Sequence, residues 1–546
     1  MEKKYYSKIP REKGDYPFYD LISLYDYRLR TAPDVPLYTF TDYHTGVRTQ
    51  IMPEEFVAQY QALGTWLAEQ RYERKHIAVM GDSSYEWIRT MQAVICSNNV
   101  LVALDRNLEI GTLVEMLKAS DAELLFCSEK YRDKAEKLSG ILGIKVLILE
   151  ENAGRIEEGK KLQEAGKCGC IREKLDPYAP ALLVFTSGTM GSSKCVMLSL
   201  RNLVTNTFCC WEQMRLHYHI VFILPFHHVY GLNIAHFPYV LDGKTIHINQ
   251  SIRDLFRDIR AENPEVIVGV PLFVELFYKM VWKDIREKGL EEKVLSMIEE
   301  NRKNPELAMD EKLEMFRFAT GVLGNRIKGL IVGGAPISDK YYYGFRDLGL
   351  DVSQGYGITE CSPLVAATYL NANRPGSVGK VLQGTEMMID QPNEHGEGEV
   401  CVRSPGVMLG YYKDEEATRE VIWDGWFHTG DIGYIDEDDY VYLSGRIKNL
   451  IILANGENVS PEEIELRLID HPAIQELVVY AKGDRIAAQI YVSPDAQEEN
   501  PQEEIRRFIE QYNDSAPSFK QISVVEFRNS PFERTASQKI LRNSLQ

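Results

Sequence analysis

The chain has 546 residues, a length that allows a large buried core and more than one folding unit. Hydrophobic residues make up 44% of it and charged residues 26%, which is typical of a globular protein. The formal net charge of −18 argues against general nucleic-acid binding, which requires a basic surface. An anionic ligand would therefore need positive side chains that are gathered at one place.

The N-terminal segment MEKKYYSKIPREKGDYPFYD is charged and aromatic, so it does not resemble a signal peptide. Residues 219–241 reach the length of a membrane span, but prolines, histidines and an asparagine interrupt them. We therefore expect a buried strand, a loop and part of a helix there, and no transmembrane segment. The 9 cysteines include no pair with zinc-site spacing, which indicates free thiols in a reducing compartment. Together these features predict a cytoplasmic protein.

Short apolar runs alternate with longer amphipathic segments from residue 77 onward. Such alternation implies βαβ units and largely parallel, doubly wound sheets, whose ligands bind beyond the carboxyl ends of the strands. The predicted fold class is therefore α/β. The first series of strands and helices is predicted at residues 77–80, 85–96, 100–104, 108–118, 124–127 and 146–149. A second series of strands, separated by helices, is predicted at residues 182–185, 221–224, 245–248, 266–270 and 329–332.

The pattern changes near residue 376, where glycine-rich turns begin to separate short apolar runs such as residues 399–402. This predicts a small β-barrel-like subdomain over about 376–444. We predict a large N-terminal domain, residues 1–445, and a small α+β C-terminal domain, residues 446–546. The elements predicted in the C-terminal domain are a helix at 461–468 with Ser460 as its N-cap, and strands at 450–453, 475–480, 486–492 and 522–527.

The strongest local motif is TSGTMGSSKCVML, residues 186–198. A predicted strand leads into a loop of glycine, serine and threonine that ends at Lys194. Small residues allow backbone N–H groups and hydroxyls to close around phosphate oxygens, and the lysine adds a positive charge. The motif is not a Walker A loop, because Ser193 rather than glycine precedes the lysine. A mobile surface loop would have a similar composition, so the motif alone leaves both interpretations open.

Further segments carry groups that suit a nucleotide. In QGYGITEC, residues 354–361, two glycines permit a close approach of the backbone, Thr359 can bond to a phosphate and Glu360 can hold Mg²⁺. The segment WFHTGDIGYID contains Asp431, which can accept two hydrogen bonds from a ribose diol. The segment GRIKNLIILANGENVSPEEIE contains Arg446, whose guanidinium offers a fixed fork of donors. The other segments of this kind are LPFHHVYGL, GGAPIS and RTASQKILR, which begin at residues 224, 333 and 534.

In their order along the chain, from residue 186 to residue 534, these segments resemble the motifs of the adenylate-forming superfamily of acyl- and aryl-CoA ligases, firefly luciferase and peptide-synthetase adenylation domains. The match extends from about residue 186 to residue 542. It implies that a carboxylate attacks the α-phosphorus of ATP, with Mg²⁺ present, and that a thiol then displaces AMP from the acyl adenylate. It also implies that the small C-terminal domain is mobile and rotates between the two steps about Lys448. Coenzyme A is the thiol that we expect.

The resemblance also assigns roles to individual residues. It implies that Tyr356 stacks on adenine, that Lys539 holds the substrate carboxylate and the α-phosphate, and that His228 lies beside the reacting carboxylate and the approaching thiol. His227 matches a variable position and receives no role. The implied catalytic residues are Lys539, His228, Thr359 and Glu360, with Glu360 and Thr186 at the metal. The implied nucleotide-binding residues are Thr186, Ser187, Gly188, Thr189, Lys194, Gly334, Ala335, Pro336, Gln354, Gly355, Tyr356, Gly357, Thr359, Asp431, Arg446 and Lys539.

Three positions depart from the family pattern. Gln538 stands before the terminal lysine where the family usually has glycine, which puts the local loop geometry in question. Cys195 replaces the glycine that usually follows the lysine of the phosphate loop, and Leu200 replaces a common histidine. Neither of these two changes removes a charge that must contact phosphate.

The acyl substrate is predicted less directly. The segment PFHH at residues 225–228 differs from the form found in amino-acid-activating domains, so we expect a plain carboxylic acid. The charged helical stretch at residues 272–317 resembles long-chain acyl-CoA synthetases, and a surface insertion with no bearing on the substrate is the alternative. Aryl or medium-chain acids are also open, as is a phosphopantetheinyl carrier protein in place of coenzyme A. A non-catalytic nucleotide-binding protein is the third alternative. The joint presence of Lys194, Glu360, Asp431, Arg446 and Lys539 argues against it.

Overall fold

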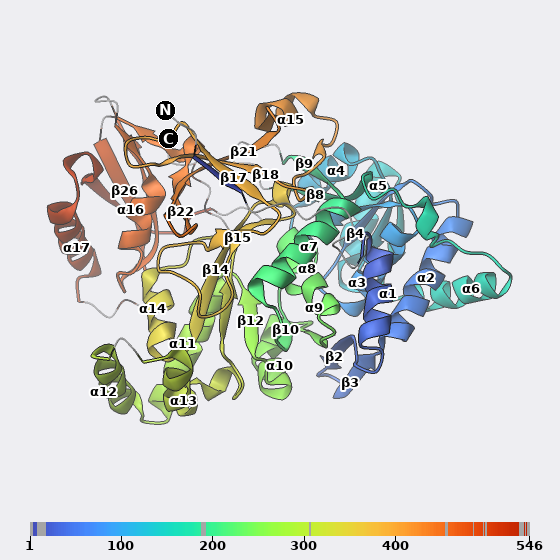
Figure 1. The fold of residues 1–546 in the computed structure, drawn as a ribbon, viewed down its shortest axis with the longest axis horizontal. Helices are drawn as coiled ribbons and strands as arrows, with labels where there is room; N and C mark the ends of the chain where they lie inside the picture. The colour runs from blue at the N-terminus through green and yellow to red at the C-terminus, as the bar shows by residue number, and fades with distance from the viewer. Residues whose placement is uncertain are drawn as a thin grey trace.

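The structure is a computed structural model that describes residues 4–7, 18–186, 193–304, 307–453, 457–483, 485–494, 496, 499–533, 540 and 542. Two large sheets and a small antiparallel sheet lie side by side, and a compact C-terminal unit lies beyond them at one end of the molecule (Figure 1). The predicted α/β class is confirmed. Within the described part of the chain, no helix is long and apolar enough to cross a membrane.

The first large sheet has seven strands in the order β19-β9-β8-β5-β4-β6-β7. Its strands β8, β5, β4, β6 and β7 pair in parallel, as the βαβ pattern predicts. The run at residues 182–185 was predicted to start the second series of strands, but it belongs to this first sheet. The strands are β4 (His76–Met80), β5 (Val100–Leu104), β6 (Ala122–Cys127), β7 (Lys145–Ile148), β8 (Pro180–Phe185), β9 (Cys195–Ser199) and β19 (Gly410–Tyr411). The helices that precede or connect these strands along the chain are α2 (Pro53–Glu69), α3 (Tyr85–Cys96), α4 (Ile110–Ala119), α5 (Arg132–Leu142) and α6 (Asn152–Glu164).

The second large sheet has nine strands in the order β16-β15-β14-β13-β12-β10-β11-β2-β3. The strands predicted at residues 221–224, 245–248, 266–270 and 329–332 form its parallel centre. Its strands are β2 (Tyr38–Asp42), β3 (Val47–Ile51), β10 (Ile220–Phe222), β11 (Ile246–Ile248), β12 (Val266–Gly269), β13 (Gly329–Val332), β14 (Asp351–Gly357), β15 (Leu364–Ala367) and β16 (Lys380–Val381). The helices of this region are α7 (Leu200–Met214), α8 (Val229–Ala235), α9 (Phe237–Leu241), α10 (Leu255–Glu262), α11 (Pro271–Glu287), α12 (Glu291–Arg302), α13 (Met309–Thr320) and α14 (Asp339–Asp347).

The glycine-rich region folds as a small antiparallel sheet, in the order β1-β17-β18-β21-β20 with β22 paired to β21. One strand comes from the N-terminus, where β1 pairs with β17. Nothing in the local sequence pattern predicts this long-range pairing. The strands are β1 (Lys4–Ser7), β17 (Glu386–Asp390), β18 (Gly398–Arg403), β20 (Ile422–Trp423), β21 (Trp426–Ile435) and β22 (Val441–Arg446), and helix α15 (Glu415–Val421) precedes β20.

The C-terminal unit is α+β, as predicted, with a mixed three-stranded sheet. Ser460 stands at the N-cap position of α16, but its side chain bonds to Glu462 instead of to the helix backbone. The predicted capping position is therefore confirmed, although the Ser460 side chain makes no capping hydrogen bond to the helix. The elements are β23 (Ile451–Ile452), β24 (Asn458–Val459), α16 (Pro461–Leu468), β25 (Ile474–Lys482), β26 (Arg485–Val492), α17 (Pro501–Ser515) and β27 (Ile522–Arg528).

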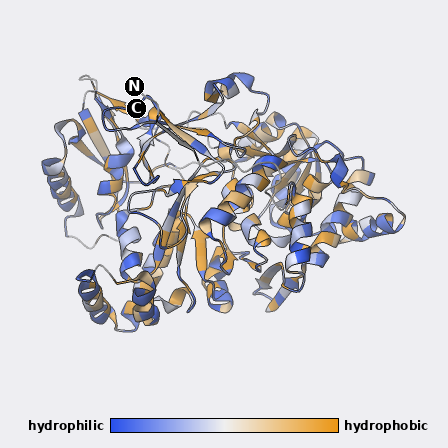
Figure 2. Cartoon of the chain, viewed as in Figure 1, coloured by the Kyte–Doolittle hydropathy of each residue, from blue (hydrophilic) through white to orange (hydrophobic). Residues whose placement is uncertain are grey.

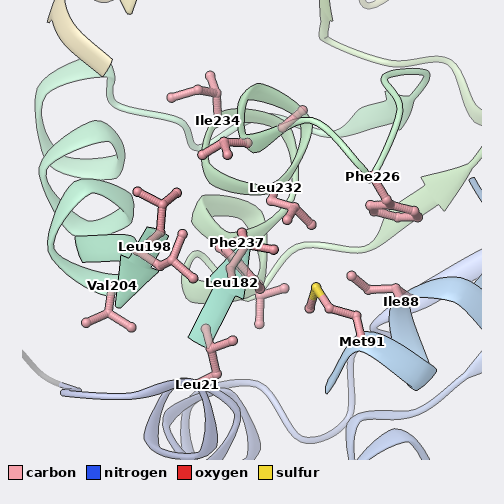
Figure 3. Close-up of a cluster of buried hydrophobic side chains, with 14 of the residues drawn as sticks. Leu21, Ile88, Met91, Leu182, Leu198, Val204, Phe226, Leu232, Ile234 and Phe237 are labelled. Atoms are coloured by element: carbon pink, nitrogen blue, oxygen red, sulfur yellow. The ribbon is translucent and has the colours of Figure 1, made fainter. Parts of the chain in front are cut away.

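The largest hydrophobic core lies where both large sheets meet helices α1 (Leu21–Thr31), α3, α7, α8 and α9. Removal of the apolar side chains of this core from water is the main driving force that holds the two large sheets together. Central strands are largely hydrophobic, whereas the peripheral helices α12 and α17 carry many hydrophilic residues (Figure 2). Figure 3 shows apolar side chains of the largest core packed together, among them Leu21, Ile88, Met91, Leu182, Leu198, Val204, Phe226, Leu232, Ile234 and Phe237.

Candidate active site

The phosphate-loop motif begins directly after β8 and continues into β9, and these two strands pair antiparallel. The N–H of Thr186 donates to the carbonyl of Lys194 at 3.0 Å, which closes the neck of the loop. Three of the predicted phosphate ligands, Ser187, Gly188 and Thr189, lie outside the described residues. Cys195 follows on β9 and is buried, and this burial raises the pKa of its thiol to about 12. The cysteine that departs from the family pattern therefore packs into the core.

Lys194 leaves this neck and reaches a tyrosine that lies in none of the sequence motifs. Its Nζ lies 4.6 Å from the ring centroid of Tyr411, a distance typical of a cation–π contact. The hydroxyl of Tyr411 donates to Oε1 of Glu360 at 2.9 Å. The predicted phosphate lysine and the predicted metal ligand therefore contact the same aromatic side chain.

Glu360 lies in the short 3₁₀ helix η5 (Thr359–Cys361), directly after β14. Its carbonyl accepts a hydrogen bond from the N–H of Met408 at 2.7 Å. The glycines of QGYG were predicted in a loop, but they lie within strand β14. A Cβ on Gly357 would lie 2.6 Å from the carbonyl oxygen of Pro363, so the close approach of two chain segments requires glycine there.

Helix α7 fixes the segments that carry Glu360 and Tyr411. The helix starts with a capping box between Ser199 and Asn202, which satisfies donors at its N-terminus. The amide of Asn202 donates to the carbonyls of Pro405 and Val407, and that of Asn206 donates to those of Cys361 and Leu364. Two asparagines of one helix thus hold the chain on both sides of the Tyr411–Glu360 contact.

A second polar group joins Tyr356, Asp431 and Arg446. The hydroxyl of Tyr356 donates to Oδ2 of Asp431, and Nε of Arg446 donates to Oδ1, each at 2.6 Å. Asp431 and Arg446 face each other as partners in the β21–β22 pair. Burial, and then the neighbouring Asp431 charge, raise the pKa of Tyr356, which keeps its hydroxyl a donor. Burial lowers the pKa of Arg446, but the charges of its neighbours, Asp431 most strongly and Glu360 also, outweigh this effect and raise the pKa.

The turn that carries Asp431 is held from the neighbouring strand β18. Glu399 accepts hydrogen bonds from the N–H of Gly430 and from Nδ1 of His428, both at 2.9 Å. The Thr429 hydroxyl donates to the carbonyl of Val400 at 2.7 Å and accepts from the N–H of Asp431 at 3.0 Å. Potential metal-ligand atoms of Glu399, Cys401 and His428 lie within 4.8 Å of one another. Since both oxygens of Glu399 already accept hydrogen bonds, this cluster serves to support the turn.

The segment GGAPIS follows β13 at the carboxyl end of the parallel sheet, as the fold class predicts. Gly334 has a φ of +85°, a conformation that glycine adopts without strain, and Gly334, Ala335 and Pro336 are exposed. Oε1 of Gln354 accepts from the N–H of Ile337 at 3.4 Å, which ties this segment to β14. Gly355 also lies on β14, one residue before the buried Tyr356.

The two histidines of LPFHHVYGL lie at the start of helix α8. His228 is at the N-cap position, and its ring centroid is 4.3 Å from that of His227. His227 is buried, with Nε2 3.8 Å from a carboxylate oxygen of Asp105. Burial, followed by repulsion from His228 and Arg106, lowers the pKa of His227 well below its usual value. His227 is therefore a neutral core residue, which agrees with its lack of an assigned role.

Residues 30–412 match the family described as AMP-binding enzyme, and residues 448–546 match the AMP-binding enzyme C-terminal domain. The chain belongs to the AMP-binding enzyme family. This confirms the resemblance to adenylate-forming enzymes that the motifs indicated.

Three known proteins illustrate the similarity. The chain is 27% identical over 478 residues to a long-chain-fatty-acid–CoA ligase of Mycobacterium bovis, which covers 83% of this chain and 78% of that protein. It is 29% identical over 456 residues to 4-coumarate–CoA ligase 2 of Petroselinum crispum, with 79% and 77% covered. The solved structure of O-succinylbenzoate coenzyme A synthetase (MenE) from Bacillus subtilis with ATP and magnesium ion has a TM-score of 0.72 and 22% identity, and covers 96% of this chain and 98% of that one.

Lys448, the predicted hinge residue, is the first residue of the C-terminal match to the AMP-binding enzyme family. Lys448 is exposed in the 3₁₀ turn η6 (Ile447–Asn449). A Cβ on Gly445 would lie 2.2 Å from Oγ of Ser460, so glycine permits the start of α16 to pack closely here. The hydroxyl of Ser338 also bonds to Asp470, which links the C-terminal unit to the region before α14. Lys539 and Gln538 lie outside the described residues.

Four site residues of this AMP-binding enzyme were not found from the sequence, namely Tyr411, Glu399, Asn202 and Asn206. Tyr411, Glu399 and Asn206 contact motif residues from far away in the chain, and Asn202 contacts the segment before Tyr411. Only Asn202 had a nearby signal, because Arg201-Asn202 follows the phosphate loop, directly after the Leu200 that departs from the family pattern.

Proposed function

We propose that this protein is an ATP-dependent, AMP-forming acid–thiol ligase that makes an acyl adenylate and passes the acyl group to coenzyme A. The observation that carries the proposal is that two buried carboxylates, Asp431 and Glu360, are each oriented by a hydrogen bond from a tyrosine hydroxyl. A carboxylate beside a tyrosine suits a nucleoside, and a lysine with a second carboxylate suits a metal-bound phosphate chain. Membership of the AMP-binding enzyme family supports this interpretation.

For the nucleotide, we propose that Asp431 binds the ribose hydroxyls and that Tyr356 and the Gly334–Pro336 segment bind the base. The orientation of Asp431 by Tyr356 and Arg446 supports its role, because a fixed acceptor loses little freedom when the ribose binds. The exposed segment after β13 is available to a flat ring. Lys194, Thr359 and the loop at residues 186–189 would contact the phosphates.

The residues present fit a magnesium ion. Glu360 is only 8% exposed and offers carboxylate oxygens, the ligands that this hard cation prefers, and Thr186 at the start of the phosphate loop offers a hydroxyl. When bound, Mg²⁺ offsets negative charge on the phosphates. The solved MenE complex contains ATP and a magnesium ion, which supports Mg²⁺ as the metal that accompanies ATP.

For the two chemical steps, we propose different residues. Lys539 would bind the substrate carboxylate and the α-phosphate during adenylation, while His228 lies where the thiol approaches the acyl carbonyl. Simultaneous binding of the reactants lowers the entropic cost of each step. The division at residue 445, with Lys448 as the hinge of a mobile C-terminal domain, completes the proposal. It is supported by the break between the two family matches, which end at residue 412 and begin at residue 448.

For the acid, we propose a fatty acid as the substrate. The long-chain-fatty-acid–CoA ligase of Mycobacterium bovis supports this choice, and so do the three helices α11, α12 and α13, which fill the predicted helical stretch. An aryl acid is the second candidate, because 4-coumarate–CoA ligase 2 has comparable identity. Both relatives are CoA ligases, which favours coenzyme A over a carrier-protein thiol. The nine free cysteines support a reducing compartment such as the cytoplasm.

The test is exchange of labelled pyrophosphate into ATP, measured across a panel of fatty and aryl acids of different length. We expect exchange with fatty acids, and acyl-CoA formation when coenzyme A is added. Exchange restricted to aryl acids would replace the fatty-acid assignment. Absence of exchange with every acid, from protein that is shown to be folded, would contradict the proposed function itself.

A further inference from the structure

The strand that carries Tyr411 is attached directly to the phosphate-loop hairpin. Strand β19 pairs antiparallel with β9, so that Tyr411 lies opposite Val196, two residues after Lys194. The N–H of Tyr411 donates to the hydroxyl of Thr418 at 2.9 Å. The backbone of this tyrosine is therefore fixed by its neighbours on both sides, and its side chain projects from a rigid strand.

The side chain of Tyr411 donates a hydrogen bond to a buried carboxylate. Tyr411 is 6% exposed and Glu360 is 8% exposed, and the phenol donates to Oε1 at 2.9 Å. A buried carboxylate without a donor is strongly destabilised, so this bond fixes the position of Glu360 as well as satisfying it. The other carboxylate oxygen can then be turned toward a ligand.

The same ring also contacts the positive group of the site. The Nζ of Lys194 lies 4.6 Å from its centroid, while no direct ion pair joins Lys194 and Glu360, both of which the structure describes. Without the Tyr411 ring, Lys194 and Glu360 would form an ion pair, because opposite charges attract each other strongly at a partly buried site. A paired lysine and carboxylate would be less available to phosphate and to metal.

We propose that Tyr411 is a positioning residue that keeps Lys194 and Glu360 apart and oriented, so that the lysine receives phosphate and the carboxylate receives Mg²⁺. The proposal rests on the proposed function only for the identity of the ligand, Mg·ATP. It adds a residue that no nucleotide-binding motif of the sequence includes. Asn202 and Asn206 of α7 support it, because they hold the two chain segments that bring Tyr411 to Glu360.

The two contacts of Tyr411 can be separated by substitution. Tyr411→Phe removes the hydroxyl and keeps the ring, whereas Tyr411→Leu removes both. Tyr412→Phe is the matched control, because the neighbouring tyrosine donates to Asp121 at 2.7 Å, far from Glu360 in the chain. ATP binding is measured by isothermal titration calorimetry with and without Mg²⁺, after thermal melts show that each variant is folded.

We expect Tyr411→Phe to raise the apparent dissociation constant for Mg²⁺ in the presence of ATP about tenfold, the size of one hydrogen bond to a charged group. ATP binding without Mg²⁺ should stay within about twofold of that of the unaltered protein. Tyr411→Leu should also weaken metal-free ATP binding by about fivefold, because Lys194 loses its aromatic contact. Tyr412→Phe should change neither constant.

A second comparison distinguishes positioning from a general loss of packing. In a Glu360→Gln background, Tyr411→Phe should cause no further change in the Mg²⁺ dependence, because the hydroxyl acts through that carboxylate. Equal effects of Tyr411→Phe with and without the metal, or no effect at all, would overturn the proposal. If the protein binds Mg·ATP but shows no pyrophosphate exchange, the proposed ligase function is overturned, whereas the proposed positioning role of Tyr411 is not.

Discussion

The hydroxyl of Tyr356 donates a hydrogen bond to Oδ2 of Asp431 across 75 residues of chain, with 2.6 Å between the two oxygens. The other carboxylate oxygen accepts from Arg446 at 2.6 Å. Both oxygens are therefore oriented by donors on different strands before any ligand binds. Such an arrangement reduces the reorganisation that nucleotide binding would otherwise require.

Asp431→Asn should weaken ATP binding by about 10–100-fold, because a neutral amide keeps the size of the carboxylate but loses two charge-assisted bonds. Calorimetry with ATP measures this effect. Asp438→Asn is the control, since Asp438 is an exposed carboxylate that pairs with Arg374 in the next turn of the same sheet. Unchanged ATP affinity in Asp431→Asn would exclude the carboxylate from the nucleotide site.

Glu399→Gln should weaken ATP binding by a smaller factor, about 3–10-fold, because Glu399 orients the Gly430 turn without contacting the ligand. The double variant with Asp431→Asn should show less than the sum of the two effects. Glu397→Gln provides the control, because Glu397 accepts from Ser444 on the edge of the same sheet. Fully additive effects would show that Glu399 acts independently of the ribose turn.

Much of the fold follows from local sequence. Helix α3 and helix α16 begin and end at the predicted residues, because their apolar residues repeat at helical spacing and no proline interrupts them after the first turn. Most strands of the parallel sheets were also found, since buried parallel strands are continuous apolar runs, but β2 and β14, which pair in parallel with β11 and β13, were not. What local pattern does not encode is pairing between distant segments, as with β1 and β17 or the membership of β8 in the first sheet.

The candidate site shows the same limit. Motifs identified Lys194, Glu360, Asp431 and Arg446, because charged residues beside glycines at strand ends are more typical of ligand-binding sites than of cores. They missed Tyr411, because a tyrosine between apolar residues is also the usual composition of a core strand. The position of QGYG was also misjudged. Its glycines were attributed to a nucleotide-binding loop, whereas Gly357 lies in a strand pressed against Pro363.

Lys539→Ala should lower pyrophosphate exchange by about 10²–10³-fold, the loss expected for one charge-stabilising group. Transfer of a supplied acyl adenylate to coenzyme A should be close to normal, because the proposal assigns the lysine to adenylation only. His228→Ala should show the opposite pattern, with slower thioester formation. Normal exchange in Lys539→Ala would contradict the assignment of this lysine.

A buried charge cluster around His247 makes stability depend on pH. The imidazole is fully buried on β11, with Nε2 3.1 Å from Asp258 and Nδ1 3.2 Å from Glu262, both on α10. Burial alone would lower the pKa of His247, but the two carboxylates reverse this effect and raise it. The pKa of Asp258 is lowered in spite of burial by hydrogen bonds with His247 and Tyr43. The pKa of Glu262 is lowered in spite of burial by His219, His247 and Arg48. The folded state therefore favours the charged form of all three groups.

His247→Gln should reduce stability by about 3–5 kcal/mol near pH 6, because it leaves the buried Asp258 without its cation and leaves Glu262 with only Arg48 and His219. The histidine's contribution is complete below its unfolded pKa of about 6.5 and disappears as pH rises through the higher folded value. The carboxylates contribute above about pH 4 and lose that contribution as pH falls. The difference in unfolding midpoint between the unaltered protein and His247→Gln should thus be largest between about pH 5 and 6.5 and shrink above it. His395→Gln, at a histidine that is 76% exposed, should show no such profile, and a constant difference for His247→Gln up to pH 9 would refute the charged cluster.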